Sequence, residues 1–142
     1  MRFVEEFDVT ASPSEALAFI ADFANLQQWD SSVTQVEYDS DQSFGVGAKY
    51  QVTLMFAGRE QRMEYRVMQY VAGEFAELRG ENDSSVAVDR VTVKAKGDGA
   101  RVTYEADIRL SGWVAWLDPI LALVFAPTVK RAVRSMRRHL SA

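Results

Sequence analysis

The C-terminal segment 112–142 constrains the fold of this chain more than any other part of the sequence. Between Trp113 and Val129 the only charged residue is Asp118, so the first half of the segment is apolar on nearly every side. A helix of this kind must pack against another apolar surface, which the rest of the chain has to provide. The apolar residues that recur at helical spacing are Trp113, Trp116, Leu117, Ile120, Leu121, Val124, Phe125, Val129, Ala132, Val133, Met136 and Leu140.

Pro127 interrupts this helical pattern. A proline inside a helix removes one backbone hydrogen bond and clashes with the carbonyl four residues earlier, here that of Leu123. We therefore expect a kink or break between a gate segment, 113–125, and an anchored segment, 128–140. The apolar run is also shorter than the roughly 20 residues that span a bilayer, so we do not predict a transmembrane helix.

Most of the chain before this helix alternates apolar and polar residues, which is typical of half-buried strands. Glycine-containing turns separate the later strands, so these strands should pair as antiparallel neighbours. The predicted strands are 2–9, 33–38, 49–56, 59–70, 75–79, 85–96 and 101–110.

Two short helices are predicted between the first and second strands. Ser12 suits the N-cap of the first helix, Pro13 its first position, and Glu15 can complete a capping box. The second helix is expected at 22–29. The chain thus reads as a single α+β domain, 1–142, with a seven-stranded curved antiparallel sheet wrapped around a long C-terminal helix. Such a sheet often encloses a cavity, because a helix about 10 Å wide does not fill its concave face.

Charge is distributed unevenly along the sequence. The net charge is −4, yet all 20 acidic residues lie at or before Asp118 and five of the 16 bases follow it. The body carries 11 bases against 20 acids, and this balance of −9 argues against nucleic-acid binding. The basic tail has two interpretations: a solvated outer face of a packed helix, or peripheral contact with an anionic membrane surface.

The residues of common catalytic and metal sites are missing. No cysteine is present, and the only histidine, His139, lies near the helix C-terminus, where it can interact favourably with the helix dipole. No group of acids and histidines has metal-ligand spacing. We therefore expect neither a metal nor a cofactor, and the lack of cysteine fits a cytoplasmic setting.

Polar groups inside the expected cavity are the remaining candidates. Alternation with Val91 and Val93 would direct Asp89 inward, but valines occur on both faces of this strand and a bulge would reverse the phase. An inward carboxylate needs a partner such as Arg79 on the neighbouring strand. Asp89 is either a structural or exposed acid, or a ligand-orienting or catalytic carboxyl with a raised pKa. Apolar-face tyrosines are either ordinary core or cavity wall. The candidate ligand-binding residues are Tyr50, Leu54, Met63, Tyr65, Arg79, Asp89, Tyr104, Trp116, Ile120 and Val124.

The chain resembles the helix-grip (START/Bet v 1-like) superfamily, and within it the small bacterial polyketide cyclase/dehydrase and lipid-transport proteins (SRPBCC). The stretches that carry the resemblance are SPSEALAFIADFANLQQWD, GDGARVTYEADIRLSG and SGWVAWLDPILALVFAPTVKRAVRSMRRHL, within an order of strand, two short helices, six strands and one long helix. The resemblance implies this fold across the whole chain. It does not choose one function, because the group includes carriers, hormone-binding proteins and cyclases.

Three functions follow as hypotheses. The first is a non-catalytic carrier of a hydrophobic small molecule such as a lipid, isoprenoid or polyketide, as a monomer or homodimer. The second is a cyclase or dehydratase acting on a polyketide-like substrate, with Asp89 or a tyrosine as the acid or base. The third is an interaction protein whose apolar helix docks on a membrane or a partner.

Overall fold

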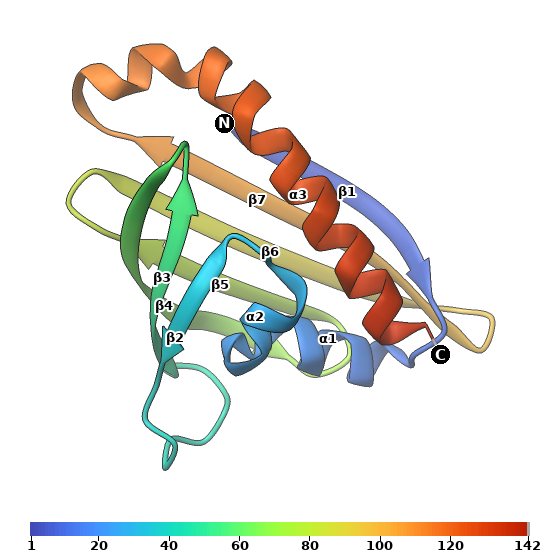
Figure 1. Ribbon diagram of the computed structural model, residues 1–142. Coiled ribbons are helices and arrows are strands. Elements are labelled where there is room, and N and C mark those ends of the chain that lie inside the picture. The colour runs from blue at the N-terminus through green and yellow to red at the C-terminus, as the bar shows by residue number, and fades with distance from the viewer. Residues whose placement is uncertain (142) are drawn as a thin grey trace.

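Seven antiparallel strands form one sheet in the order β1-β7-β6-β5-β4-β3-β2, which curves around the C-terminal helix α3 (Figure 1). The computed structural model describes residues 1–141, apart from the side chain of Trp113. The strands are β1 (Arg2–Val9), β2 (Val33–Glu37), β3 (Lys49–Phe56), β4 (Arg59–Val71), β5 (Phe75–Glu81), β6 (Ser85–Lys96) and β7 (Gly99–Leu110). The helices are α1 (Pro13–Ala21), η1 (Phe23–Asn25), α2 (Leu26–Trp29), η2 (Gly112–Leu117) and α3 (Asp118–Leu140), of which η1 and η2 are 3₁₀-helices.

The fold predicted from the alternation of residues is confirmed, and each predicted strand is present within two residues of its expected ends. The Ser12 side chain accepts a hydrogen bond from the Glu15 backbone N–H, so the predicted N-cap of α1 is also confirmed. The predicted second helix is divided into η1 and α2. The Asp22 carboxylate caps the Ala24 N–H at 3.0 Å and begins a 3₁₀ turn before the single turn of α2.

The core lies between the concave face of the sheet and the helices. α1 packs on β5, β6 and β7, whereas α3 packs on β1 and α2. Only the second half of α3 is buried, through Val129, Ala132, Val133, Met136 and Leu140. These residues recur every three or four positions and form one apolar stripe.

The first half of α3 differs from the sequence expectation. The helix begins with the 3₁₀ turn η2, and most of the apolar side chains that follow do not pack on the sheet. η2 and the start of α3 instead arch over the end of the molecule toward which the β3–β4 hairpin points (Figure 1). The sheet therefore covers one half of the helix only, and a hollow remains beneath the other half.

Of the predicted kink or break at Pro127, the break does not occur: α3 continues through this residue. The predicted division of the segment into two parts nevertheless matches its burial. Every buried side chain of α3 follows Pro127, and none precedes it in the described part of the helix.

Candidate functional site

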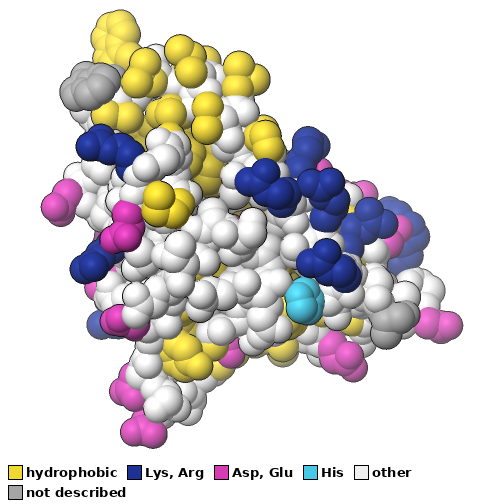
Figure 2. Space-filling model, viewed as in Figure 1, with side chains coloured by type: hydrophobic (Ala, Val, Ile, Leu, Met, Phe, Trp, Pro, Cys, Tyr) yellow, Lys and Arg dark blue, Asp and Glu magenta, His cyan; other side chains and the backbone are white. Residues whose placement is uncertain are grey.

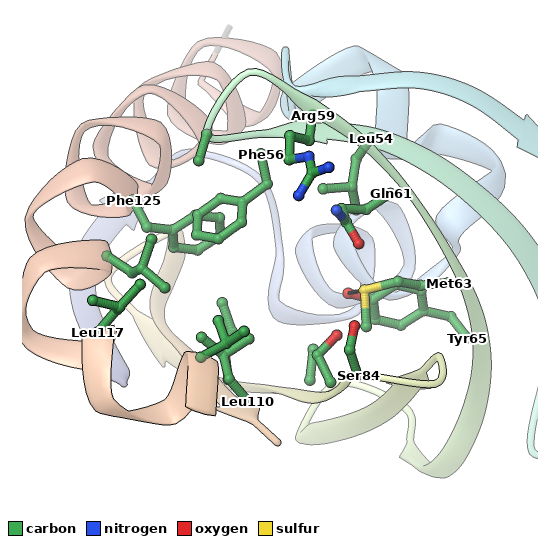
Figure 3. Close-up of a pocket in the computed structure, with 16 residues that line it drawn as sticks. Leu54, Phe56, Arg59, Gln61, Met63, Tyr65, Ser84, Leu110, Leu117 and Phe125 are labelled. Atoms are coloured by element: carbon green, nitrogen blue, oxygen red, sulfur yellow. Dashed lines mark hydrogen bonds between the residues drawn. The ribbon is translucent and has the colours of Figure 1, made fainter. Parts of the chain in front are cut away.

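The hollow beneath the first half of α3 is a pocket of about 370 Å³ (Figure 3). Four parts of the chain form its wall: the β3–β4 hairpin, the turn between β5 and β6, the end of β7, and η2 with the start of α3. The lining residues are Leu54, Phe56, Ala57, Arg59, Gln61, Met63, Tyr65, Ser84, Ser85, Ala87, Ile108, Leu110, Val114, Leu117, Leu121 and Phe125. Most of them are apolar, and none is a carboxylate.

The tip of the β3–β4 hairpin places one aromatic side chain against the helix. Ala57 and Gly58 both have positive φ angles, 53° and 77°, as a tight two-residue hairpin turn requires. Phe56, directly before this turn, meets Phe125 of α3 with ring centroids 5.1 Å apart in an edge-on arrangement. Phe125 also lies 5.4 Å from Phe3 of β1. Of these three rings, those of Phe56 and Phe125 line the pocket.

Small residues on β5 and β6 make room for Tyr65 at the floor. Tyr65 pairs with Gly80, and a β-carbon at Gly80 would lie 2.5 Å from the Tyr65 ring. Gly80 in turn pairs with Ala87, which lines the pocket. The absence of larger side chains here allows the tyrosine ring to lie across the sheet.

Among the described residues, the Tyr65 hydroxyl has only a weak hydrogen-bond acceptor, the Met63 sulfur at 3.9 Å. Burial raises the pKa of Tyr65 well above its usual 10, and the nearby carboxyls of Asp89 and Asp30 raise it further. The hydroxyl therefore stays protonated at neutral pH. It can donate a hydrogen bond to an oxygen atom held in the pocket.

A polar cluster lies in the core outside the pocket lining. Tyr104 donates a hydrogen bond to Asp89 Oδ2 at 3.0 Å, and both side chains are buried. The pKa of Asp89 is raised to about 7, mainly by burial. The Tyr104 hydrogen bond lowers this pKa, whereas the Asp30 carboxyl contributes to raising it. The indole Nε1 of Trp29, which packs edge-on to Tyr104 at 5.9 Å, has no hydrogen-bond partner among the described residues.

The strand residues predicted to bind ligand fall into two groups. Leu54, Met63 and Tyr65 line the pocket. Tyr50 and Tyr104 do not line it: their hydroxyls are bonded to Asp22, at 2.8 Å, and to Asp89. Asp89 is inward, as the alternation predicts, but belongs to the buried cluster.

The predicted pairing of Arg79 with Asp89 is wrong. Leu78 is the residue that faces Asp89 across β5 and β6, which places Arg79 on the outer face of the sheet. Its side chain is exposed, with Glu81 Oε2 at 3.9 Å. Arg79 therefore contributes nothing to the pocket wall.

On the helix, the predicted ligand-binding residues are offset by one position from those that line the pocket. Trp116, Ile120 and Val124 are exposed, whereas Leu117, Leu121 and Phe125 face the pocket. Each residue of the first set directly precedes one of the second, so the sequence alone does not distinguish the two faces. The side chain of Trp113, another apolar residue of the predicted helical pattern, lies outside the described part of the structure.

Several lining residues were missed because they belong to turns and strand ends, where alternation weakens. The hairpin residues Arg59 and Gln61 and the turn residues Ser84 and Ser85 are of this kind. Within residues 1–141, no group of three or more histidines and acids is placed to hold a metal ion.

Pro127 separates the two halves of α3, and its replacement tests whether the first half moves when a ligand enters. In Pro127→Ala, the new N–H can bond the Leu123 carbonyl, and alanine is favoured over proline inside a helix by about 3 kcal/mol. We expect several-fold slower exchange of a bound fluorescent ligand in stopped-flow experiments. Unchanged exchange rates would show that the two halves do not move separately.

Comparisons with known proteins agree on one fold. A family model described as polyketide cyclase/dehydrase and lipid transport matches residues 1–141. No curated protein sequence matches the chain. Many solved structures match it, among them the protein TTHA0849 from Thermus thermophilus, with 13% sequence identity and a TM-score of 0.81, covering 99% of this chain and 97% of that one.

Two further solved structures share this fold. A START superfamily protein from Mycobacterium smegmatis has 12% identity and a TM-score of 0.77, covering 98% of this chain and 96% of that one. The di-domain ARO/CYC protein BexL from the BE-7585A biosynthetic pathway also has 12% identity, with a TM-score of 0.75. The match covers all of this chain (100%) and 50% of BexL. At these identities the likeness shows the fold alone.

Proposed function

This chain belongs to the polyketide cyclase/dehydrase and lipid transport family, and from that premise we propose that it carries a hydrophobic or amphipathic small molecule in the pocket beneath α3. The pocket itself is the observation that carries the proposal. Its volume of about 370 Å³ lies within the usual range of small-molecule sites. An apolar wall with few polar groups is also what such sites have in common.

The polar groups of the wall suggest how such a ligand is oriented. Arg59 and Gln61 project toward the pocket from β4, and Ser84 lies across from them (Figure 3). Tyr65 offers its hydroxyl at the floor. A ligand with an apolar body and one or two oxygen atoms satisfies these groups, whereas a highly charged ligand would lack partners along most of the wall.

Tyr65→Phe tests this orientation. The hydroxyl is bonded only to sulfur, so its removal should change the free energy of unfolding by less than about 1 kcal/mol. Loss of a hydrogen bond to the ligand, worth about 0.5–1.5 kcal/mol, should weaken binding of an oxygen-bearing probe such as naphthol by roughly 2–12-fold. Binding of naphthalene, which has no oxygen atom, should not change.

Tyr50→Phe is the matched control for this experiment. It removes a tyrosine hydroxyl bonded to Asp22, outside the pocket, and should leave the preference for naphthol over naphthalene unchanged. Equal loss of both probes in Tyr65→Phe, measured by fluorescence titration, would contradict a polar role for this hydroxyl. Failure of the wild-type protein to take up either probe would count against the carrier function itself.

A cyclase or dehydratase is the second candidate, and Asp89 is the observation that favours it. A carboxyl with a pKa of about 7 is poised for proton transfer near neutral pH. Asp89 does not line the pocket, which is why the carrier function comes first. Turnover of a polyketide-like substrate that depends on pH and disappears in Asp89→Asn would favour the enzyme.

A further inference from the structure

The outward face of the C-terminal helix is apolar in its first half. Trp116 of η2 is 87% exposed, and on α3 Leu123 and Ile120 are 78% and 61% exposed. Figure 2 shows hydrophobic side chains gathered at this end of the molecule. Large apolar side chains exposed together usually mark an interaction surface.

Basic residues continue the same face along the second half of α3. Positions 120, 124, 127, 131, 134 and 138 are three or four residues apart, and so they lie on one side of an α-helix. A line of apolar residues therefore passes directly into a line of arginines, and Figure 2 shows basic side chains beside the apolar end. The exposed bases of α3 are Lys130, Arg131, Arg134, Arg137 and Arg138.

Most of these bases lack an acidic partner. Lys130 lies 3.1 Å from Glu5, but across residues 1–141 the arginines of α3 form no salt bridge. Arg138 instead donates to a neutral group, the Ser135 hydroxyl at 3.4 Å. The positive tail is thus available to an external anion, while the body of the chain, at −9, would be repelled by it.

We propose that this docking face, which comprises Trp116, Ile120, Leu123, Arg134 and Arg138, binds the surface of an anionic lipid bilayer. Tryptophan and leucine enter the boundary between headgroups and acyl chains. The arginines, farther along the same helix, bind headgroup phosphates. Among the described residues, no helix combines the length and the hydrophobicity that spanning a bilayer requires.

A second copy of the chain fits the docking face less well. Twofold symmetry would bring the same patch of each copy together. The arginines of each helix would then lie against either the arginines or the apolar half of the other helix, and neither supplies an acid. An anionic bilayer supplies both the apolar layer and the negative charge that this face lacks.

Flotation with vesicles tests the proposal. The wild-type protein should float with vesicles of equal parts phosphatidylcholine and phosphatidylglycerol, be released by high salt, and not float with phosphatidylcholine alone. Each base near an anionic surface contributes roughly five-fold in binding, so R134Q/R137Q/R138Q should reduce the partition coefficient on the order of 100-fold. W116S/L123S, at two highly exposed positions, should also release the protein.

Matched controls come from other surfaces. R62Q/K94Q/R109Q removes three exposed charges from the outer face of the sheet, and Val46→Ser removes an apolar side chain that is also exposed. Both should float as wild type does. Docking needs the outward face and not the pocket, so a variant with a filled pocket, Leu54→Trp, should float as well, which separates this proposal from the carrier function.

Two results would overturn the proposal. One is the absence of flotation with anionic vesicles. The other is a loss of flotation in R62Q/K94Q/R109Q as large as that in R134Q/R137Q/R138Q, because this would show a general effect of charge. Sedimentation that reveals a dimer lost in W116S/L123S, without any vesicle binding, would assign the face to a second copy instead.

Discussion

Asp89→Asn is expected to stabilise the protein above pH 7, by up to about 4 kcal/mol. The buried carboxyl has a pKa of about 7 in the folded protein and 3.8 when unfolded. One unit of pKa difference corresponds to about 1.4 kcal/mol. An asparagine at this position can still accept the hydrogen bond from Tyr104, so the substitution removes the cost of the charge and keeps the contact.

The direction of the pH dependence follows from proton uptake. Between about pH 4 and pH 7 the folded protein holds a proton on Asp89 that the unfolded chain has released. The contribution of Asp89 to the free energy of unfolding is therefore highest below pH 3.8. It is lost as the pH rises through about 7, the pKa of the folded protein. Asp30, whose pKa burial also raises, acts in the same direction.

Urea unfolding at about pH 5 and about pH 8 measures this effect. The free energy of unfolding of the wild type should fall from the lower to the higher pH, whereas that of Asp89→Asn should fall much less. Asp107→Asn, on the outer face of β7, is the control and should follow wild type. An equal change in the free energy of unfolding of wild type and Asp89→Asn between these pH values would mean that the carboxyl is not held protonated in the core.

Leu54→Trp is expected to abolish most ligand binding without unfolding the protein. Leu54 is half-buried on β3 and its side chain lines the pocket, so an indole there occupies the space of a ligand. Forcing a ligand into an overfilled cavity costs about 1–3 kcal/mol, which weakens binding roughly 5–160-fold. Titration with a neutral apolar fluorophore such as N-phenylnaphthylamine gives the affinity.

Met55→Trp provides the matched control. Met55 is the next residue of β3, and its side chain is exposed on the opposite face of the sheet. The same indole at this position should leave the affinity unchanged. Equal affinities of Leu54→Trp and wild type would mean that the fluorophore binds elsewhere. Equal losses of affinity in Leu54→Trp and Met55→Trp would mean the same.

The fold was predictable because two simple periodicities describe most of the chain. Alternation located all seven strands, and helical spacing located the C-terminal helix. Alternation with Val91 and Val93 favoured an inward Asp89, but valines on both faces of the strand left its phase open. Alternation did not identify the hydrogen-bond partner of Asp89. Arg79 lies on β5 and Tyr104 on β7, and only the register of these strands against β6 shows which side chain can reach Asp89.

The pocket was predictable in kind but only partly in its residues. Leu54, Met63 and Tyr65 come from clearly alternating strands. On the helix, adjacent apolar residues such as Ile120 and Leu121 satisfy the same helical spacing, and only the three-dimensional packing distinguishes the exposed one from the lining one. Turn residues such as Ser84 have no periodicity from which to infer their direction.

Native mass spectrometry of the protein purified from its own host, followed by organic extraction, tests the carrier function most directly. We expect a defined hydrophobic molecule bound to the wild-type protein and to Met55→Trp, and absent from Leu54→Trp. A wild-type protein that has the mass of the chain alone, and takes up nothing from a panel of lipids and polyketides, would contradict it.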